Sequence, residues 1–529
     1  MPGRDAAPAP TAPQAAWPRR AGLLTVAVAV LAFACALAKV TSYDTWVHLS
    51  VGRWIAAEGR VPRANLISHT QPDRPTIEHR WLFQVGLWGL WRLGGPGAAT
   101  VVKAALAGAA FALVLATARR KGAEIFVAAV FAVLAACAAR FRLTLRPQVV
   151  AFLLFAAYLL VLERWRRGER WGILALLPLQ VLWANVHGSA ILGIGLGLGY
   201  AGAESLRWAL RRATRDVEPG PRGIAALAGL WAVAGALAAL TLVNPHGWRV
   251  LTLPFLHAET QKLSGLKELL RDRSSLRWAD LAGRHACFAA LAGLGLASLA
   301  GSVRRKDVTE AGLLLGLLAA AVHSERFIGL FAVGGAPICA RNLSPALRGP
   351  LHRVARRIEA TQGRGMLALY AAAVLVLVTT VGMSPTVKEL PPGLGVAEGR
   401  FPREELAAAQ ARCPKGKLFN EFEHGGYIYW QATRPVFIDS RGLLAYSSSF
   451  VQSYVAAWAS PRAWAELLER HDIAVALVGH RGPGDQRQLS LARWGWRHVY
   501  RGPVCSVFVR EDRLDGPGEV VARAGGSAR

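Results

Sequence analysis

The chain has 529 residues, of which 53% are hydrophobic and only 18% are charged. Soluble globular chains carry about 25% charged residues, and the mean hydropathy of this chain is +0.29. Six cysteines are too few for a disulfide scaffold, and the composition excludes collagen and a wholly disordered chain. The remaining class is a membrane protein with some extramembrane mass attached.

The basic residues are placed as they are in membrane proteins. Lys and Arg number 62 against 34 Asp and Glu, which gives a formal net charge of +28. Such a charge is also typical of nucleic-acid-binding proteins. Many of the Arg residues, however, form short clusters between apolar blocks, where they set the side of the membrane on which each loop lies. We therefore expect no nucleic-acid partner.

Long apolar segments predict a mainly α fold, a polytopic helical membrane bundle over residues 21–384. A helix that crosses the hydrocarbon layer needs about 20 mostly apolar residues, because the layer is about 30 Å thick and a helix rises about 1.5 Å per residue. We expect about eleven spans, several of them short. The predicted spans are 21–40, 97–117, 123–139, 149–162, 172–186, 188–203, 224–243, 286–302, 308–322, 327–340 and 366–384.

The basic clusters fall on alternate connections between these spans, and therefore on one side of the membrane. The positive-inside rule makes that side cytoplasmic, which places the N-terminus inside and residues 385–529 outside. Residues 1–20 are expected to form a disordered cytoplasmic tail. Segment 21–40 also resembles a signal peptide, but we interpret it as an uncleaved helix because its apolar run is long. The clusters are Arg19-Arg20, Arg119 to Lys121, Arg164 to Arg170, Arg207 to Arg222, Arg304 to Lys306 and Arg341 to Arg364.

Residues 385–529 are more polar than the rest and predict a small extracytoplasmic α/β domain. The spacing of Trp464, Leu467 and Leu468 indicates a helix over 461–470. The expected strands are 417–420, 427–430, 435–438, 473–479 and 504–509.

Two cysteines, Cys413 and Cys505, lie in this domain, near its two ends. The predicted topology places both in one oxidising compartment, and the chain ends of a compact domain often lie close together. A disulfide between them and a pair of free thiols are both open alternatives.

The first external loop, residues 41–96, carries the candidate catalytic groups. Helices are expected over 46–58 and 81–93, with Trp and Leu on one side as in interfacial helices. Asp44 precedes the first helix, where it either caps the helix or acts in catalysis, and His48 lies one turn further on. Acids and histidines beside a span are costly unless they are used. The candidate catalytic residues are Asp44, His48, Glu78 and His79.

The later external loops each bring at least one Arg or His to the same membrane face. An Arg can neutralise the phosphate of a leaving group, although a single interfacial Arg is often only snorkelling. Asp44, His48, His79 and His187 leave a divalent metal open as a cofactor, but they lack the spacing of a dedicated metal motif, and no other cofactor is indicated. The candidate donor-phosphate ligands are Arg80, Arg146, His187 and Arg326.

Several short motifs resemble polytopic glycosyltransferases of the GT-C superfamily, especially its bacterial, protein-mannosyltransferase-like members. The motifs are YDTWVHLSVGRWIAAEGRVPR (43–63), EHRWL (78–82), RPQ (146–148), WANVHG (183–188), LFNEFEHGGYIYW (418–430) and RPVFIDSRG (434–442).

The resemblance implies a transferase in a bacterial inner membrane, part of cell-envelope assembly, with Asp44 as the catalytic acid of the first external loop. It implies a polyprenyl-phosphate-linked sugar donor that enters from the bilayer and a glycan, lipid or protein acceptor on the outer side. Many members carry a second acid beside the first, whereas Thr45 follows Asp44 here. Glu78 is the substitute that the sequence offers.

Two other functions remain open from the sequence. The same Arg and His groups would suit a transporter or flippase for lipid-linked glycans. A non-catalytic envelope-glycan assembly protein would instead work through its external domain. An Asp44→Asn substitution distinguishes these from a transferase, because only catalysis requires the carboxylate.

Overall fold

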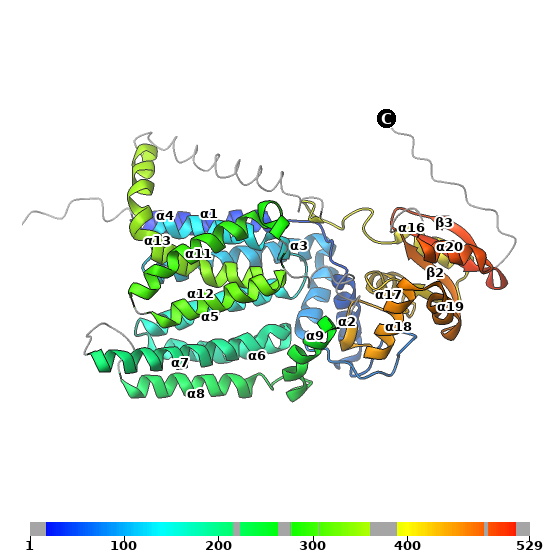
Figure 1. Cartoon of the computed structure of the whole chain (residues 1–529), viewed down its shortest axis with the longest axis horizontal. Helices are drawn as coiled ribbons and strands as arrows, with labels where there is room; N and C mark the ends of the chain where they lie inside the picture. Colours follow the sequence, from blue (N-terminus) through cyan, green and yellow to red (C-terminus); the bar gives the residue numbers. More distant parts are fainter. Residues whose placement is uncertain are drawn as a thin grey trace, which may run out of the picture.

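The computed structural model describes residues 17–214, 223–262, 276, 278–305, 307–359, 389–480 and 485–514. In this part of the chain, long helices lie side by side in one bundle, and a mixed α/β region projects from one end of it (Figure 1). The bundle helices are α1 (Trp17–Ala36), α3 (Trp81–Lys121), α4 (Ile125–Ala139), α5 (Gln148–Arg166), α6 (Leu176–Val186), α7 (Ile191–Thr214), α8 (Ile224–Leu240), α11 (Ala286–Arg304), α12 (Val308–His323) and α13 (Ile328–Glu359).

Each of the first ten predicted spans coincides with one of these helices, so the mainly helical membrane fold is confirmed. Five helical segments among the described residues are long and apolar enough to cross a membrane, and others are shorter. The eleventh predicted span, 366–384, and residues 1–16 of the expected tail lie outside the described residues. The exact number of spans therefore stays a prediction.

Helix α3 joins the first external loop to the second span, and its helical turns are interrupted once, at Gly94 and Gly95. The sequence predicts two helices here, and the structure merges them across a kink at Gly94 and Gly95, which Pro96 follows. Gly95 has φ 59°, a left-handed conformation that glycine adopts at no steric cost. The kink lets the amphipathic segment that begins at Trp81 turn into the bundle.

At the bundle end away from the α/β region, charged side chains form a buried ion-pair network. Lys121 of α3 lies 2.9 Å from Glu163 of α5 and 3.0 Å from Glu310 of α12. Arg166 of α5 pairs with Asp307 at 2.9 Å, and Arg341 of α13 pairs with Glu310 at 2.8 Å. Because buried charges are tolerated only when they are paired, this network locks four helices together. Lys121, Arg166 and Arg341 belong to three of the predicted basic clusters, which the network therefore places at the same end of the bundle.

The α/β region is built on a four-stranded sheet with strand order β1-β2-β4-β3. Strand β2 is parallel to β1 and antiparallel to β4, and β3 pairs antiparallel with β4. Every residue of β2 is buried, as expected of a strand that is covered on both faces. The strands are β1 (Lys417–Asn420), β2 (Ile473–Gly479), β3 (Trp496–Arg501) and β4 (Cys505–Arg510).

Helices from two distant parts of the chain cover this sheet. Side chains of α18 and α19 pack on one face. The other face is covered by α16 and by α2 of the first external loop, so that Val47 and Val51 share a core with Val475 and Val507. The helices are α2 (Asp44–Glu58), α16 (Arg403–Arg412), α17 (Gly425–Ala432), α18 (Ser448–Ala459), α19 (Pro461–Arg470) and α20 (Gln486–Arg493), and α9 (Leu253–Lys262) lies in a later loop.

Two expectations for the α/β region are wrong. Residues 427–430 belong to helix α17 rather than to a strand, and 435–438 contributes only an isolated bridge from Val436 to Ser68. Cys413 and Cys505 are both buried free thiols, so the disulfide alternative is not realised. Burial raises the pKa of the Cys505 thiol, which keeps it protonated and unreactive.

Candidate functional site

Asp44 lies in the first turn of α2, where it faces Arg146. Its Oδ2 is 3.3 Å from Arg146 Nε, and the two side chains are 27% and 20% exposed. The same Nε donates to Ser42 Oγ at 2.6 Å, and Thr45 Oγ1 donates to the Leu145 carbonyl at 2.9 Å. Tyr43, not Asp44, is the N-cap residue. The capping alternative is therefore wrong, and the carboxylate is held by Arg146 at a site that solvent can reach.

The glycines of the motif LFNEFEHGGYIYW bring α17 against this turn. A Cβ at Gly426 would lie 2.6 Å from Val47 Cγ2 and 3.0 Å from the Val47 nitrogen, and a Cβ at Gly425 would lie 2.0 Å from the Ile438 carbonyl oxygen. Only glycine permits so close an approach. The C-terminal region thus fixes the helix turn that carries Asp44.

Glu78 is buried in a network that joins the first loop to the C-terminal region. Arg441 Nη1 donates to Glu78 Oε1 at 3.2 Å, and Gln84 Nε2 donates to Glu78 Oε2 at 2.9 Å. Arg441 also holds Asp439 through Nε at 2.9 Å and Nη2 at 2.8 Å, and Tyr446 donates to the same carboxylate. Burial acts to raise the pKa of Asp439, but Arg441 outweighs it and holds that pKa below its ordinary value. The Glu78 carboxylate is thus already engaged by two partners.

Two of the candidate histidines are buried and neutral. Burial first, and then Arg80 and Arg146, lower the pKa of His48 far below its ordinary value. Its Nδ1 lies 3.4 Å from Gln84 Nε2, and its Nε2 has no hydrogen-bond partner among the described residues. His187 accepts from the Ser189 backbone at 3.0 Å. Burial, followed by several Arg residues, lowers its pKa to about 3.

The charges of three guanidinium groups, from three different loops, act on His187. Its pKa is depressed, after burial, by Arg80 of the first external loop, Arg142 of the 140–148 loop and Arg326 of the 323–327 loop. Burial and the neighbouring Arg142 likewise lower the pKa of Arg326. Like charges repel unless an anion is shared between them, so this arrangement suits a phosphate. Of the predicted ligands, Arg80, His187 and Arg326 are brought together, while Arg146 holds Asp44.

His79 belongs to a hydrogen-bonded junction of three loops. Its Nδ1 lies 3.2 Å from the Ile77 carbonyl oxygen, and a Cβ at Gly188 would lie 3.1 Å from its Nε2. Asn185 Oδ1 accepts from Trp81 Nε1 at 2.6 Å and from Asn244 Nδ2 at 3.2 Å. The motif WANVHG (183–188) and the segment NPHGW (244–248) therefore pack against the start of α3.

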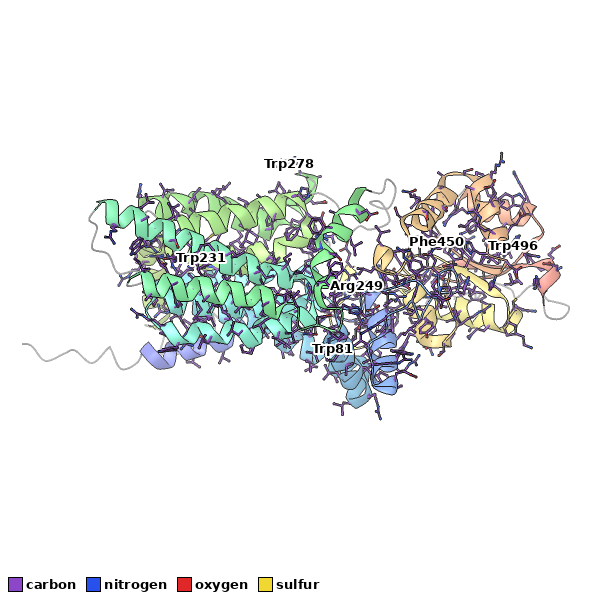
Figure 2. All side chains as sticks on the ribbon, turned by 90° about the horizontal axis from the view of Figure 1, so that it is seen from below. Trp81, Trp231, Arg249, Trp278, Phe450 and Trp496 are labelled. Atoms are coloured by element: carbon purple, nitrogen blue, oxygen red, sulfur yellow. The ribbon has the colours of Figure 1, made fainter. Side chains whose placement is uncertain are left out.

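A cavity of about 640 Å³ opens beside this junction, between the start of α3, α6 and the end of α8. Apolar side chains such as Leu82, Val181 and Leu242 line most of it, and Asn185 lies among them. Figure 2 shows Trp81 where the helical bundle meets the α/β region. The cavity thus lies at the end of the bundle next to the α/β region, on the helices that hold the candidate site.

Some site residues are placed as the sequence predicts, and others are missed. Asp44, His48, Glu78 and His79 all belong to the loop that lies between the bundle and the α/β region. Among the described residues, Asp44, His48, His79 and His187 do not include three ligand atoms close enough to hold one metal ion. From the sequence, Arg441 was missed as the partner of Glu78, and Asp439 as the second carboxylate that Arg441 binds, although the motif RPVFIDSRG that contains both was a signal.

No family model matches the chain, and no curated protein matches it. Solved structures do match. The archaeal oligosaccharyltransferase AglB from Archaeoglobus fulgidus, in complex with an inhibitory peptide and a dolichol-phosphate, has a TM-score of 0.58 at 11% identity, covering 94% of this chain and 74% of that chain. ArnT from Cupriavidus metallidurans bound to undecaprenyl phosphate has a TM-score of 0.52 at 16% identity, covering 96% of this chain and 100% of that chain.

The chain therefore shares its fold with the archaeal oligosaccharyltransferase AglB and with ArnT. The apo form of the Archaeoglobus fulgidus enzyme gives the same result, with a TM-score of 0.58 at 12% identity over 94% of this chain and 75% of that chain. Because identities this low show the fold alone, the GT-C fold does not by itself assign a donor or an acceptor.

Proposed function

We propose that this protein transfers a sugar from a polyprenyl-phosphate-linked donor to an acceptor on the extracytoplasmic face of the membrane. The observation that carries the proposal is the partly exposed Asp44 carboxylate, 3.3 Å from Arg146 Nε, together with Arg80, Arg142 and Arg326, whose charges act on His187. Arginine stays charged near the bilayer and presents a forked set of donors that matches a phosphate. The GT-C fold supports the same reading, since two of its members carry a polyprenyl phosphate in their structures.

In the proposed reaction, Asp44 accepts the proton of the acceptor hydroxyl as general base. The hydroxyl oxygen forms the new bond to the sugar C1 while the bond from C1 to the phosphate oxygen breaks. The negative charge that develops on the departing polyprenyl phosphate is neutralised by Arg80, Arg142 and Arg326. Arg146 orients the Asp44 carboxylate, with Nε 3.3 Å from Oδ2. Glu78, engaged by Arg441 and Gln84, is a positioning residue in this scheme.

The cavity beside α6 and α8 supports entry of the donor from the bilayer. Its lining is mostly apolar, as an isoprenoid chain requires. A donor whose chain lies there would place its phosphate near the polar junction at Trp81, Asn185 and Asn244. The histidines nearby stay neutral, so they do not compete with the guanidinium groups for the phosphate.

Donor kinetics test the phosphate site. Replacing Arg326 or Arg80 by Ala should raise the KM for a polyprenyl-phosphate-linked sugar by about 10-fold or more, because a charge-assisted hydrogen bond contributes about 1.5–3 kcal/mol. Arg249 is a matched control, since it is exposed and lies at the same junction of the molecule (Figure 2). Its replacement by Ala should leave the KM unchanged. Equal KM values in all three variants and the wild type would remove these arginines from the donor site.

A further inference from the structure

A second group of chemistry-bearing side chains lies next to Arg326, where two other external loops meet. Asp280 is in the short helix η7 (Trp278–Ala282), His285 immediately precedes α11, and Glu325 is in η8 (Glu325–Phe327). One ligand atom from each of the three lies within 4.8 Å of the other two. Figure 2 shows Trp278, at the start of η7, at the end of the bundle that faces the α/β region.

The imidazole of His285 is the feature that distinguishes this group from a chance cluster of acids. The side chain is fully buried, yet neither ring nitrogen has a hydrogen-bond partner among the described residues. Nε2 points to Glu325 Oε1 across 3.6 Å, which is too long for a hydrogen bond. A buried polar group without a partner costs about 1–3 kcal/mol. A ligand bound between the two side chains would remove this cost.

Backbone hydrogen bonds hold Asp280 beside His285 and fix the separate turn that carries Glu325. The His285 nitrogen donates to the Asp280 carbonyl oxygen at 2.8 Å, and the Phe327 nitrogen donates to the Ser324 carbonyl oxygen at 3.0 Å. Phe141 packs edge-on against the imidazole, with ring centroids 4.8 Å apart. The ring is therefore fixed in place, and the two carboxylates approach it from separate turns.

One imidazole and two carboxylates form a donor set that suits Zn²⁺ and similar transition-metal ions. Zn²⁺ binds nitrogen and carboxylate oxygen at about 2.0–2.2 Å. Small movements of the three side chains toward a central ion would therefore bring all three ligand atoms to bonding distance. Two carboxylates offset the ion's charge in buried surroundings. Mg²⁺ fits less well, because it prefers all-oxygen octahedral sites and keeps its waters.

We propose that Asp280, His285 and Glu325 bind one transition-metal ion of the zinc type. The ion joins the loop that contains η7 to the loop that contains η8, and three protein ligands leave a fourth position for water. Because Arg326 directly follows Glu325, an ion bound to Glu325 would also fix the position of Arg326. The proposal does not depend on the transferase activity, because it concerns a separate group of residues and a separate ligand.

The test measures Zn²⁺ binding to the full chain in detergent after removal of metal with a chelator. Isothermal titration should show one equivalent bound at micromolar affinity or tighter, and Mg²⁺ at millimolar concentration should not compete. Asp280→Asn and Glu325→Gln should each weaken binding about 100-fold or more, since even outer-shell changes cost about 10–100-fold. Asp280 is half-buried, so its variant is expected to fold.

Two control variants exclude other ligands. His323 is exposed on the neighbouring turn, and Cys287 lies two residues beyond His285. His323→Asn and Cys287→Ser should both bind Zn²⁺ as the wild type does. Absence of a bound equivalent in the wild type, or undiminished binding in both Asp280→Asn and Glu325→Gln, would overturn the proposal. Loss of binding in Cys287→Ser would assign the ion to thiols and would also overturn it.

Discussion

Replacing Arg441 by Ala should loosen the contact between the C-terminal region and the first external loop. The Arg441 side chain is 2% exposed and lies between two carboxylates, Asp439 at 2.8 Å and Glu78 at 3.2 Å. It also donates to Asn65 of the first loop. Its removal leaves two buried carboxylates without their cation, and breaking a buried pair in this way costs about 3–5 kcal/mol.

The assay is pulse proteolysis of the detergent-solubilised protein in increasing urea. The measured quantity is the fraction of protein that is cleaved in the α/β region. Arg441→Ala should lower the free energy of opening by about 3–5 kcal/mol, and Arg441→Lys by less, because it keeps the charge but loses the forked geometry. Arg462→Ala is the matched control. Its side chain is 91% exposed and pairs with Glu466 on the same helix, so we expect a change within about 0.5 kcal/mol. An effect of Arg441→Ala no larger than that of Arg462→Ala would refute the reasoning.

Two further predictions concern pH and topology. In the folded protein the pKa of His187 is lowered to about 3, whereas in the unfolded chain it is near 6.5. Between these values the unfolded chain binds a proton that the folded protein does not bind. The free energy of unfolding should therefore fall as the pH drops below about 6.5. This residue alone should contribute a slope of about 1.4 kcal/mol per pH unit; unfolding measured from pH 7.5 to 5 should show a smaller slope in His187→Asn, and identical slopes would contradict the assignment. We also expect the C-terminal region to be extracytoplasmic, so that an alkaline phosphatase fusion after Glu389 is active and one after Arg305 is inactive; the reverse pattern would overturn the topology.

Local sequence patterns correctly predicted the elements that have a regular burial pattern from end to end. Strand β2 coincides with the predicted range 473–479, and helix α19 with 461–470. Every residue of β2 is buried, which requires a continuous apolar run, and α19 buries Trp464, Leu467 and Leu468 on a single face. Both signals are periodic and short-range, and they need no knowledge of what packs against them.

Elements whose state depends on a distant partner were mispredicted or missed. Tyr427 to Trp430 has high β propensity, but the close contact of Gly426 with Val47 places this segment as a helix on α2. Strand β3 lies at the edge of the sheet and its sequence, WRHVYR, alternates too weakly to be recognised.

The candidate site shows the same limit. The sequence identified Asp44 and the basic loops, because acids and cations are conspicuous beside apolar spans. It did not identify the ion pair of Glu78 with Arg441, whose partners are 363 residues apart in the chain. Nor did it indicate that Asp280, His285 and Glu325 lie together, since these residues come from different loops and form no motif.

The transfer reaction of the Asp44→Asn variant tests the central claim most directly. Purified wild type and variant would be compared in liposomes that contain a polyprenyl-phosphate-linked sugar, with release of the polyprenyl phosphate and binding of the donor both measured. If Asp44 is the general base, the variant should bind donor as the wild type does but release polyprenyl phosphate at least about 100-fold more slowly. A variant that binds donor and transfers sugar at the wild-type rate would contradict the account.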